Sequence, residues 1–176
     1  MKKLFLIPAA LLFSFCSSKK DIVKNSEENK PVSKIESHCP SDGKCTIETF
    51  RGKSLIVKQD EFGSTYTQLE DNPETTVIQY QYNKNVKGDL QDANYREEVL
   101  FEIKNSTTQL NLSGNNLQQT KMLFGRFCFC RGQTGYYKIE QGNLKLSKNE
   151  NNLNFTLDFT ITKVPQIIKY IETSIN

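Results

Sequence analysis

The sequence of 176 residues has no tryptophan and only one histidine, His38. His38 adjoins Cys39, and because neighbouring side chains diverge along an extended chain, the two are poorly placed for a catalytic Cys-His dyad. The motifs G-x-S-x-G and H-E-x-x-H, the phosphate-binding P-loop and the c-type haem signature are also absent. We therefore expect no cofactor and favour a non-enzymatic protein, although a site assembled from dispersed acidic residues stays open.

A strong charge of either sign is lacking as well. The 23 basic and 20 acidic residues leave a net charge of +3, and no basic stripe runs along the chain, so we expect no nucleic-acid partner. What the sequence has instead is Asn, Gln, Thr, Tyr and Phe in abundance. This composition favours a surface-exposed all-β protein over a helical cytosolic enzyme, and the length suits one domain.

No hydrophobic run is long enough to cross a bilayer comfortably. The one clear apolar run extends from Leu4 to Phe15 and follows two lysines, Lys2 and Lys3. A short apolar segment behind positive charges is typical of a secretory signal. We therefore predict that residues 1–16 are a targeting segment and do not belong to the fold.

The end of this segment, LFSFC, resembles the lipobox of bacterial lipoprotein precursors. The resemblance covers residues 1–16 only and implies that Cys16 becomes the lipidated first residue of a protein anchored in a membrane of the cell envelope. Acyl chains such as palmitate contribute about 0.8 kcal/mol per buried CH₂, enough for a lasting anchor. Because Phe15 stands where a lipobox has a small residue, ordinary cleavage near Ser17 or Ser18 is the alternative.

The segment 17–37 is rich in Lys, Glu, Ser and Asn and has few large apolar residues, which predicts a flexible tether. Residues 38–176 are expected to form a single antiparallel β domain, because alternating segments such as LNFTLDFTI (153–161) are separated by turns that contain glycine. Strands are predicted at 46–51, 53–60, 64–70, 75–83, 96–105, 108–113, 120–131, 134–140, 143–148 and 152–162. Ten short strands predict a sandwich or a barrel-like curled sheet.

The carboxyl-terminal segment VPQIIKYIETSI has two interpretations. Its isoleucines and Val164 follow helical spacing, with Pro165 tolerable in a first turn, which favours a short helix or turn that closes the sheet. A strand at the edge of the sheet, started by the proline, is the rival.

Four cysteines remain if Cys16 is lipidated, and an even number indicates paired cysteines in an oxidising compartment. Cys128 and Cys130 share one face of a predicted strand, about 6.7 Å apart at twice the ~3.3 Å rise, near the limit for a disulfide. We therefore predict disulfides that tie the loop containing Cys39 and Cys45 onto strand 120–131. A cross-link of that span is worth about 4 to 5 kcal/mol, and pairing each neighbouring couple is the alternative.

A metal site is the alternative function. His38 and the four cysteines Cys39, Cys45, Cys128 and Cys130 could supply one imidazole and four thiolates to Zn²⁺ or Cu⁺. The spacing of structural zinc sites is missing, and C-x-x-C, the usual motif of thiol oxidoreductases, is absent too.

A ligand-binding surface around the sequence GQTGYYKI is the less favoured of two interpretations. Arg126 and Arg131 bracket the second cysteine pair, and Tyr136 and Tyr137 should point to opposite faces of a strand. Exposed tyrosine and arginine beside a turn suit an envelope protein or a glycan as partner. The alternative is structural, with Arg126 pairing a carboxylate.

Overall fold

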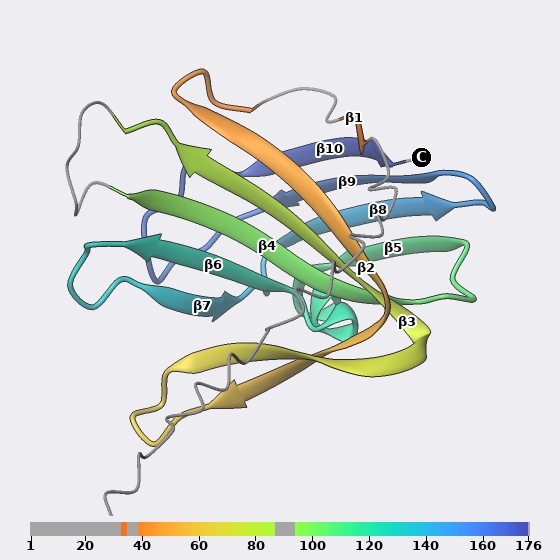
Figure 1. The fold of residues 1–176 in the computed structure, drawn as a ribbon, viewed down its shortest axis with the longest axis horizontal. Helices are drawn as coiled ribbons and strands as arrows, with labels where there is room; N and C mark the ends of the chain where they lie inside the picture. The colour runs from red at the N-terminus through yellow and green to blue at the C-terminus, as the bar shows by residue number, and fades with distance from the viewer. Residues whose placement is uncertain (1–32, 35–38, 87–93, 176) are drawn as a thin grey trace, which may run out of the picture. The chain divides into compact units, whose positions relative to one another are not determined.

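The computed structural model describes residues 33–34, 39–86 and 94–175, which form two five-stranded antiparallel sheets (Figure 1). Sheet A has the strand order β1-β10-β9-β8-β5, and sheet B has the order β2-β3-β4-β6-β7. The predicted all-β, antiparallel fold is confirmed, and it is sandwich-like, since neither sheet closes on itself within the described ranges.

Sheet A consists of β1 (Ser33–Lys34), β5 (Gln109–Ser113), β8 (Gly142–Lys148), β9 (Leu153–Phe159) and β10 (Tyr170–Ile175). Sheet B consists of β2 (Gly43–Gln59), β3 (Thr65–Lys84), β4 (Tyr95–Lys104), β6 (Leu123–Cys128) and β7 (Gly135–Lys138). A short 3₁₀ helix, η1 (Gly114–Thr120), connects the two sheets between β5 and β6.

The main core lies between the two sheets. Apolar side chains at every second position of β9 are buried, as the alternation of the sequence predicts. Phe101 on β4 meets Phe155 on β9 edge to face, with ring centroids 5.2 Å apart, and Phe124 on β6 lies 5.8 Å from Phe159. These two aromatic pairs join sheet B to sheet A.

The hairpin of β2 and β3 is much longer than the other strands and bends in its middle (Figure 1). The register shifts here, because Arg51 pairs with Thr76 whereas Lys53 pairs with Asp71. Gly52 adopts a φ of 69°, which favours glycine. Separate strands are predicted on either side of residue 52 and of residues 71–74, but β2 and β3 each continue through these points, with a β-bulge in place of the predicted strand ends.

A second, smaller core lies on the outer face of sheet B. The part of the hairpin beyond the bulge, residues 53–71, is called the distal hairpin. Leu55 of the distal hairpin packs with Val77 of β3 and Leu100 of β4, and all three are almost completely buried. Tyr136 of β7 packs against this cluster. The bend therefore places the distal hairpin over sheet B, so that part of this sheet is covered on both faces.

The predicted carboxyl-terminal helix is wrong, because residues Tyr170–Ile175 form strand β10 between β9 and β1. Ile171, Thr173 and Ile175 are the buried positions of this strand. β10 supplies the hydrogen-bond partners that β9 would otherwise lack as an edge strand, which outweighs the helical spacing.

Two further differences concern boundaries. Strand β6 begins at Leu123, later than the predicted residue 120, because η1 extends to Thr120. Ser33 and Lys34, which fall within the predicted tether, pair with β10. No helix within residues 33–34, 39–86 and 94–175 is both long and apolar enough to cross a membrane.

Candidate functional site

The four cysteines 39, 45, 128 and 130 form two local disulfides. Cys39 is bonded to Cys45, with Cα atoms 5.8 Å apart, and Cys128 is bonded to Cys130, with Cα atoms 5.2 Å apart. The predicted cross-links from the first pair to the second are therefore wrong, and the alternative pairing holds. The physical reason is topological, because β3 and β4 separate β2, which carries Cys45, from β6.

These disulfides stabilise two turns and do not join distant parts of the chain. They span six and two residues of sequence, respectively. Closing loops this short is worth about 2 kcal/mol or less each in the chain-entropy model. The domain is disulfide-stabilised, but its stability comes chiefly from the core between the sheets.

The second disulfide lies in an exposed turn at the end of β6, which we call the disulfide turn (residues 128–134). Phe129, the residue between the two cysteines, is 83% exposed. Thr134 braces the turn, because its hydroxyl accepts a hydrogen bond from the Cys128 N–H at 3.2 Å. The Gln133 N–H donates to the Cys130 carbonyl, and Gly132 between them has a φ of 71°.

An open hollow of about 580 Å³ adjoins the disulfide turn. Its lining includes the following six residues: Tyr95, Arg96, Phe127, Cys128, Phe129 and Thr134. The Arg96 guanidinium lies 4.3 Å from the centre of the Phe127 ring, a cation–π contact. The hollow thus combines aromatic, cationic and hydroxyl groups on one surface.

The two arginines that bracket the cysteines have different environments. Arg131 is exposed in the disulfide turn. Arg126 is buried, and it donates hydrogen bonds to the Gln133 amide oxygen at 2.5 Å and to the Tyr95 hydroxyl at 3.3 Å. Its guanidinium also lies over the Tyr95 ring. Arg126 therefore links the disulfide turn to β4 and is not free to bind a ligand.

Tyr136 and Tyr137 point to opposite faces of β7, as predicted. Tyr137 packs against the main core, whereas Tyr136 packs against the smaller core under the distal hairpin. Burial, together with its hydrogen bond to Glu98, raises the pKa of Tyr136 to about 12. Both tyrosines are partly buried, so β7 does not carry the exposed tyrosine that was predicted as a ligand-binding residue.

Glu97 is the most deeply buried carboxylate of the described residues, with 1% of its surface exposed. One oxygen accepts a hydrogen bond from the Ile167 N–H and the other from the Ile168 N–H, each at 2.7 Å. The Tyr95 hydroxyl also donates to Glu97. Burial, together with this hydrogen bond, raises the pKa of Tyr95 to about 12. Glu97 fastens the loop between β9 and β10 to sheet B.

Glu98 points to the opposite face of β4 and is equally well satisfied. The Gln79 side-chain amide donates to it at 3.0 Å, the Tyr136 hydroxyl donates to it as well, and the Arg96 guanidinium lies 3.5 Å away. Both glutamates thus have their oxygens occupied by partners from the chain. They are structural acceptors, and they do not form the carboxylate pair that a hydrolytic site needs.

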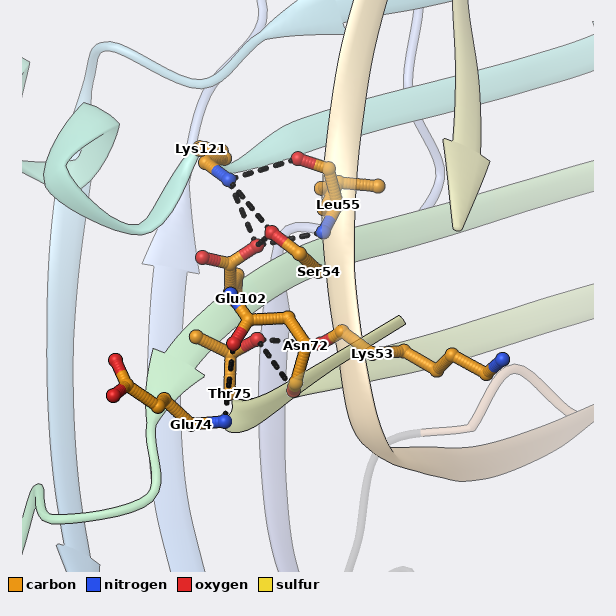
Figure 2. A network of polar contacts seen from close by, with 8 residues as sticks. All are labelled: Lys53, Ser54, Leu55, Asn72, Glu74, Thr75, Glu102 and Lys121. Atoms are coloured by element: carbon orange, nitrogen blue, oxygen red, sulfur yellow. Dashed lines mark hydrogen bonds and ion pairs between the residues drawn. The ribbon is translucent and has the colours of Figure 1, made fainter. Parts of the chain in front are cut away.

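Glu102 is the centre of a polar network that holds the start of the distal hairpin against β4 (Figure 2). Its Oε2 atom accepts hydrogen bonds from the Ser54 hydroxyl at 2.7 Å, the Leu55 N–H at 2.6 Å and the Lys121 ammonium at 2.8 Å. Lys121 also donates to the Leu55 carbonyl at 2.9 Å. Thr75 adds a bond to the Lys53 carbonyl at 2.8 Å, which closes the bulge.

This network makes the stability of the domain depend on pH. Burial alone would raise the pKa of Glu102, but the hydrogen bonds from Lys121, Ser54 and Leu55 outweigh it and lower the pKa below its ordinary value. The stabilisation is therefore present above the unfolded-state pKa and is lost as the pH falls through the folded-state pKa. We expect Glu102→Gln to lower the free energy of unfolding by about 1 to 2 kcal/mol at pH 7, with a smaller difference near pH 3.

Urea denaturation of both proteins across this pH range measures the difference. Asp71→Asn is the matched control, since its carboxyl is ion-paired with Lys53 but exposed, and its effect should be smaller. A Glu102→Gln cost that does not change with pH would contradict a stabilising role of the ionised carboxylate.

A metal centre built from both cysteine pairs is not assembled in the part of the chain that the structure describes. All four of these sulfurs are bonded in pairs, and no three potential metal-ligating side chains (His, Cys, Asp or Glu) come together there. His38, the predicted imidazole ligand, and Cys16, the predicted lipidation site, lie outside the described residues. The sequence-based metal hypothesis thus has no support in this geometry.

Comparisons with known proteins add no family. No protein-family model, no curated protein and no solved structure matches this chain.

Proposed function

We propose that the chain is a lipid-anchored protein of the bacterial cell envelope whose disulfide-stabilised β domain is a binding or structural module. The observation that carries this proposal is the use of the cysteines. Four of the five cysteines form two disulfides, Cys39–Cys45 and Cys128–Cys130, which leaves Cys16 as the fifth. Disulfides persist outside the cytosol, which agrees with a signal segment ahead of Cys16.

The disulfide turn and the adjoining hollow support the module function. Phe129 is 83% exposed, and an exposed aromatic ring offers a large apolar contact area to a partner. Beside it lie the Phe127 ring and the Arg96 guanidinium, which suit contact with a protein or with a sugar ring. An envelope protein or a glycan is therefore the proposed partner, reached from a membrane through residues 17–32, which precede β1.

The anchor is tested by replacing Cys16. We expect the wild-type chain, expressed in a bacterium, to partition into the detergent phase, and Cys16→Ser to lower its membrane-to-soluble ratio at least about tenfold. Immunoblotting of the fractions measures this ratio, and mass spectrometry of the amino-terminal peptide identifies the acyl groups on Cys16. Ser17→Ala is the matched control, and its distribution should equal that of the wild type. An unmodified amino terminus at Ser17 or Ser18 would contradict the proposal.

A further inference from the structure

The two disulfides have different surroundings. Cys39 and Cys45 pack against the main core, and Cys45 lies within β2 opposite the completely buried Tyr82. Cys128 and Cys130 pack against neither core cluster of the described residues, and the residue between them is exposed. The folded domain thus supports the first disulfide more than the second.

The second disulfide also closes the shorter loop, since its cysteines are two residues apart and the others are six apart. A disulfide between cysteines close in sequence removes little conformational entropy from the unfolded chain. Folding therefore stabilises Cys128–Cys130 less than it stabilises Cys39–Cys45. When the bond opens, residues 128–130 can straighten from a Cα separation of 5.2 Å toward the ~6.7 Å of an extended strand. Opening therefore requires a local change only.

Access and charge favour chemistry at this pair. Cys128 is partly exposed and lines the open hollow, so an attacking thiolate can approach this residue from solvent. Arg131 follows Cys130 directly, and no acidic residue occurs between Lys121 and Ile139. A positive charge in this turn favours the thiolate that develops on the leaving sulfur, and the exposed Arg131 is the cation nearest to Cys130 along the chain.

We propose that Cys128 and Cys130 form a reversible disulfide that accepts two electrons from a dithiol, while Cys39–Cys45 stays oxidised. One thiolate of the dithiol attacks the Cys128 sulfur and forms a mixed disulfide, and Cys130 leaves as a thiolate that takes up a proton. The second thiol of the dithiol loses its proton and attacks the other sulfur of the dithiol, which is the one bonded to Cys128 in the mixed disulfide. This closes the disulfide of the former dithiol and releases Cys128, which is protonated in turn.

Two electrons and two protons thus pass from the dithiol to the cysteine pair. A small-molecule disulfide such as oxidised glutathione returns the pair to its bonded state by the reverse chemistry. This activity is independent of the lipid anchor and of any binding partner, so its test does not depend on the proposed function.

Equilibrium with glutathione tests the proposal on the full wild-type chain in detergent. Samples are held at stepped ratios of reduced to oxidised glutathione, quenched with acid and alkylated, and each cysteine pair is quantified by peptide mass spectrometry. We expect Cys128–Cys130 to be half reduced at a value of [GSH]²/[GSSG] at least about tenfold lower than Cys39–Cys45. Equal midpoints, or earlier reduction of Cys39–Cys45, would overturn the proposal.

Matched double variants provide a kinetic test with dithiothreitol as the dithiol. The variant Cys39→Ser with Cys45→Ser should keep the fast phase of disulfide reduction, and Cys128→Ser with Cys130→Ser should lose it. Circular dichroism establishes that each variant is folded before it is compared. A fast phase that survives the loss of Cys128 and Cys130 would refute the assignment, whatever the glutathione midpoints are.

Discussion

Replacing Glu97 by alanine is expected to lower the free energy of unfolding by about 3 to 5 kcal/mol, a large part of the ~5–15 kcal/mol that stabilises a typical domain. The carboxylate accepts hydrogen bonds from the Ile167 and Ile168 N–H groups and from the Tyr95 hydroxyl, and 99% of the glutamate's surface is covered. Alanine leaves all three donors without this acceptor, and an unsatisfied donor costs about 1 to 3 kcal/mol where it is buried, as the Ile168 N–H is.

Urea denaturation measures the loss, and hydrogen exchange locates it, because the amide of Ile168, in the loop between β9 and β10, should lose protection before the amides of sheet A. Glu97→Gln keeps one carbonyl oxygen and should fall between alanine and the wild type. Glu61→Ala changes an exposed glutamate in the tip of the distal hairpin and controls for loss of a carboxylate as such. A loss below about 1 kcal/mol for Glu97→Ala would mean that water replaces the carboxylate and that the loop is not held as we describe.

Phe101→Ala should be comparably destabilising, with a loss of about 3 to 5 kcal/mol. Phe101 is completely buried on β4 and meets Phe155 of the opposite sheet edge to face. The substitution removes the ring and leaves a cavity between two sheets that cannot both move inward, so little of the lost contact is recovered.

Thermal and urea unfolding measure this effect. Phe62→Ala is the matched control, because Phe62 is 85% exposed and the same substitution there should change stability by no more than about 0.5 kcal/mol. If Phe101→Ala and Phe62→Ala were equally mild, the two sheets would not share the core that we assign to them.

The strands follow from local patterns. The alternation in β9 and β4 is visible in the sequence because every second side chain meets the core, and the bulge occurs where glycine and proline interrupt the alternation at Gly52 and Pro73. The sequence predicts a helix in place of β10 for two reasons. Thr173 is a polar residue at a buried position, which hides the strand alternation, and the isoleucines suit a helical period equally well.

The burial of the three glutamates on β4 cannot be read from the local pattern either. In the segment EEVLFEI, Glu98 and Glu102 alternate with apolar residues and look like the solvent face of a half-buried strand, and Glu97 precedes them as one more charged residue. They are covered because Leu55 and its hairpin fold back over β4, and because the loop before β10 reaches Glu97. A partial signal was present, since the residues between these glutamates are apolar at consecutive positions, which is typical of a strand buried on both faces.

The all-β class and the antiparallel strands can be read from the amino-acid sequence, because both depend on side-chain periodicity and composition over a few neighbouring residues. Tertiary structure alone decided which cysteines are bonded, which carboxylates are buried and how the long hairpin folds back over its own sheet. Those features depend on groups far apart in the chain, and their pairing follows from strand order, which no local pattern specifies.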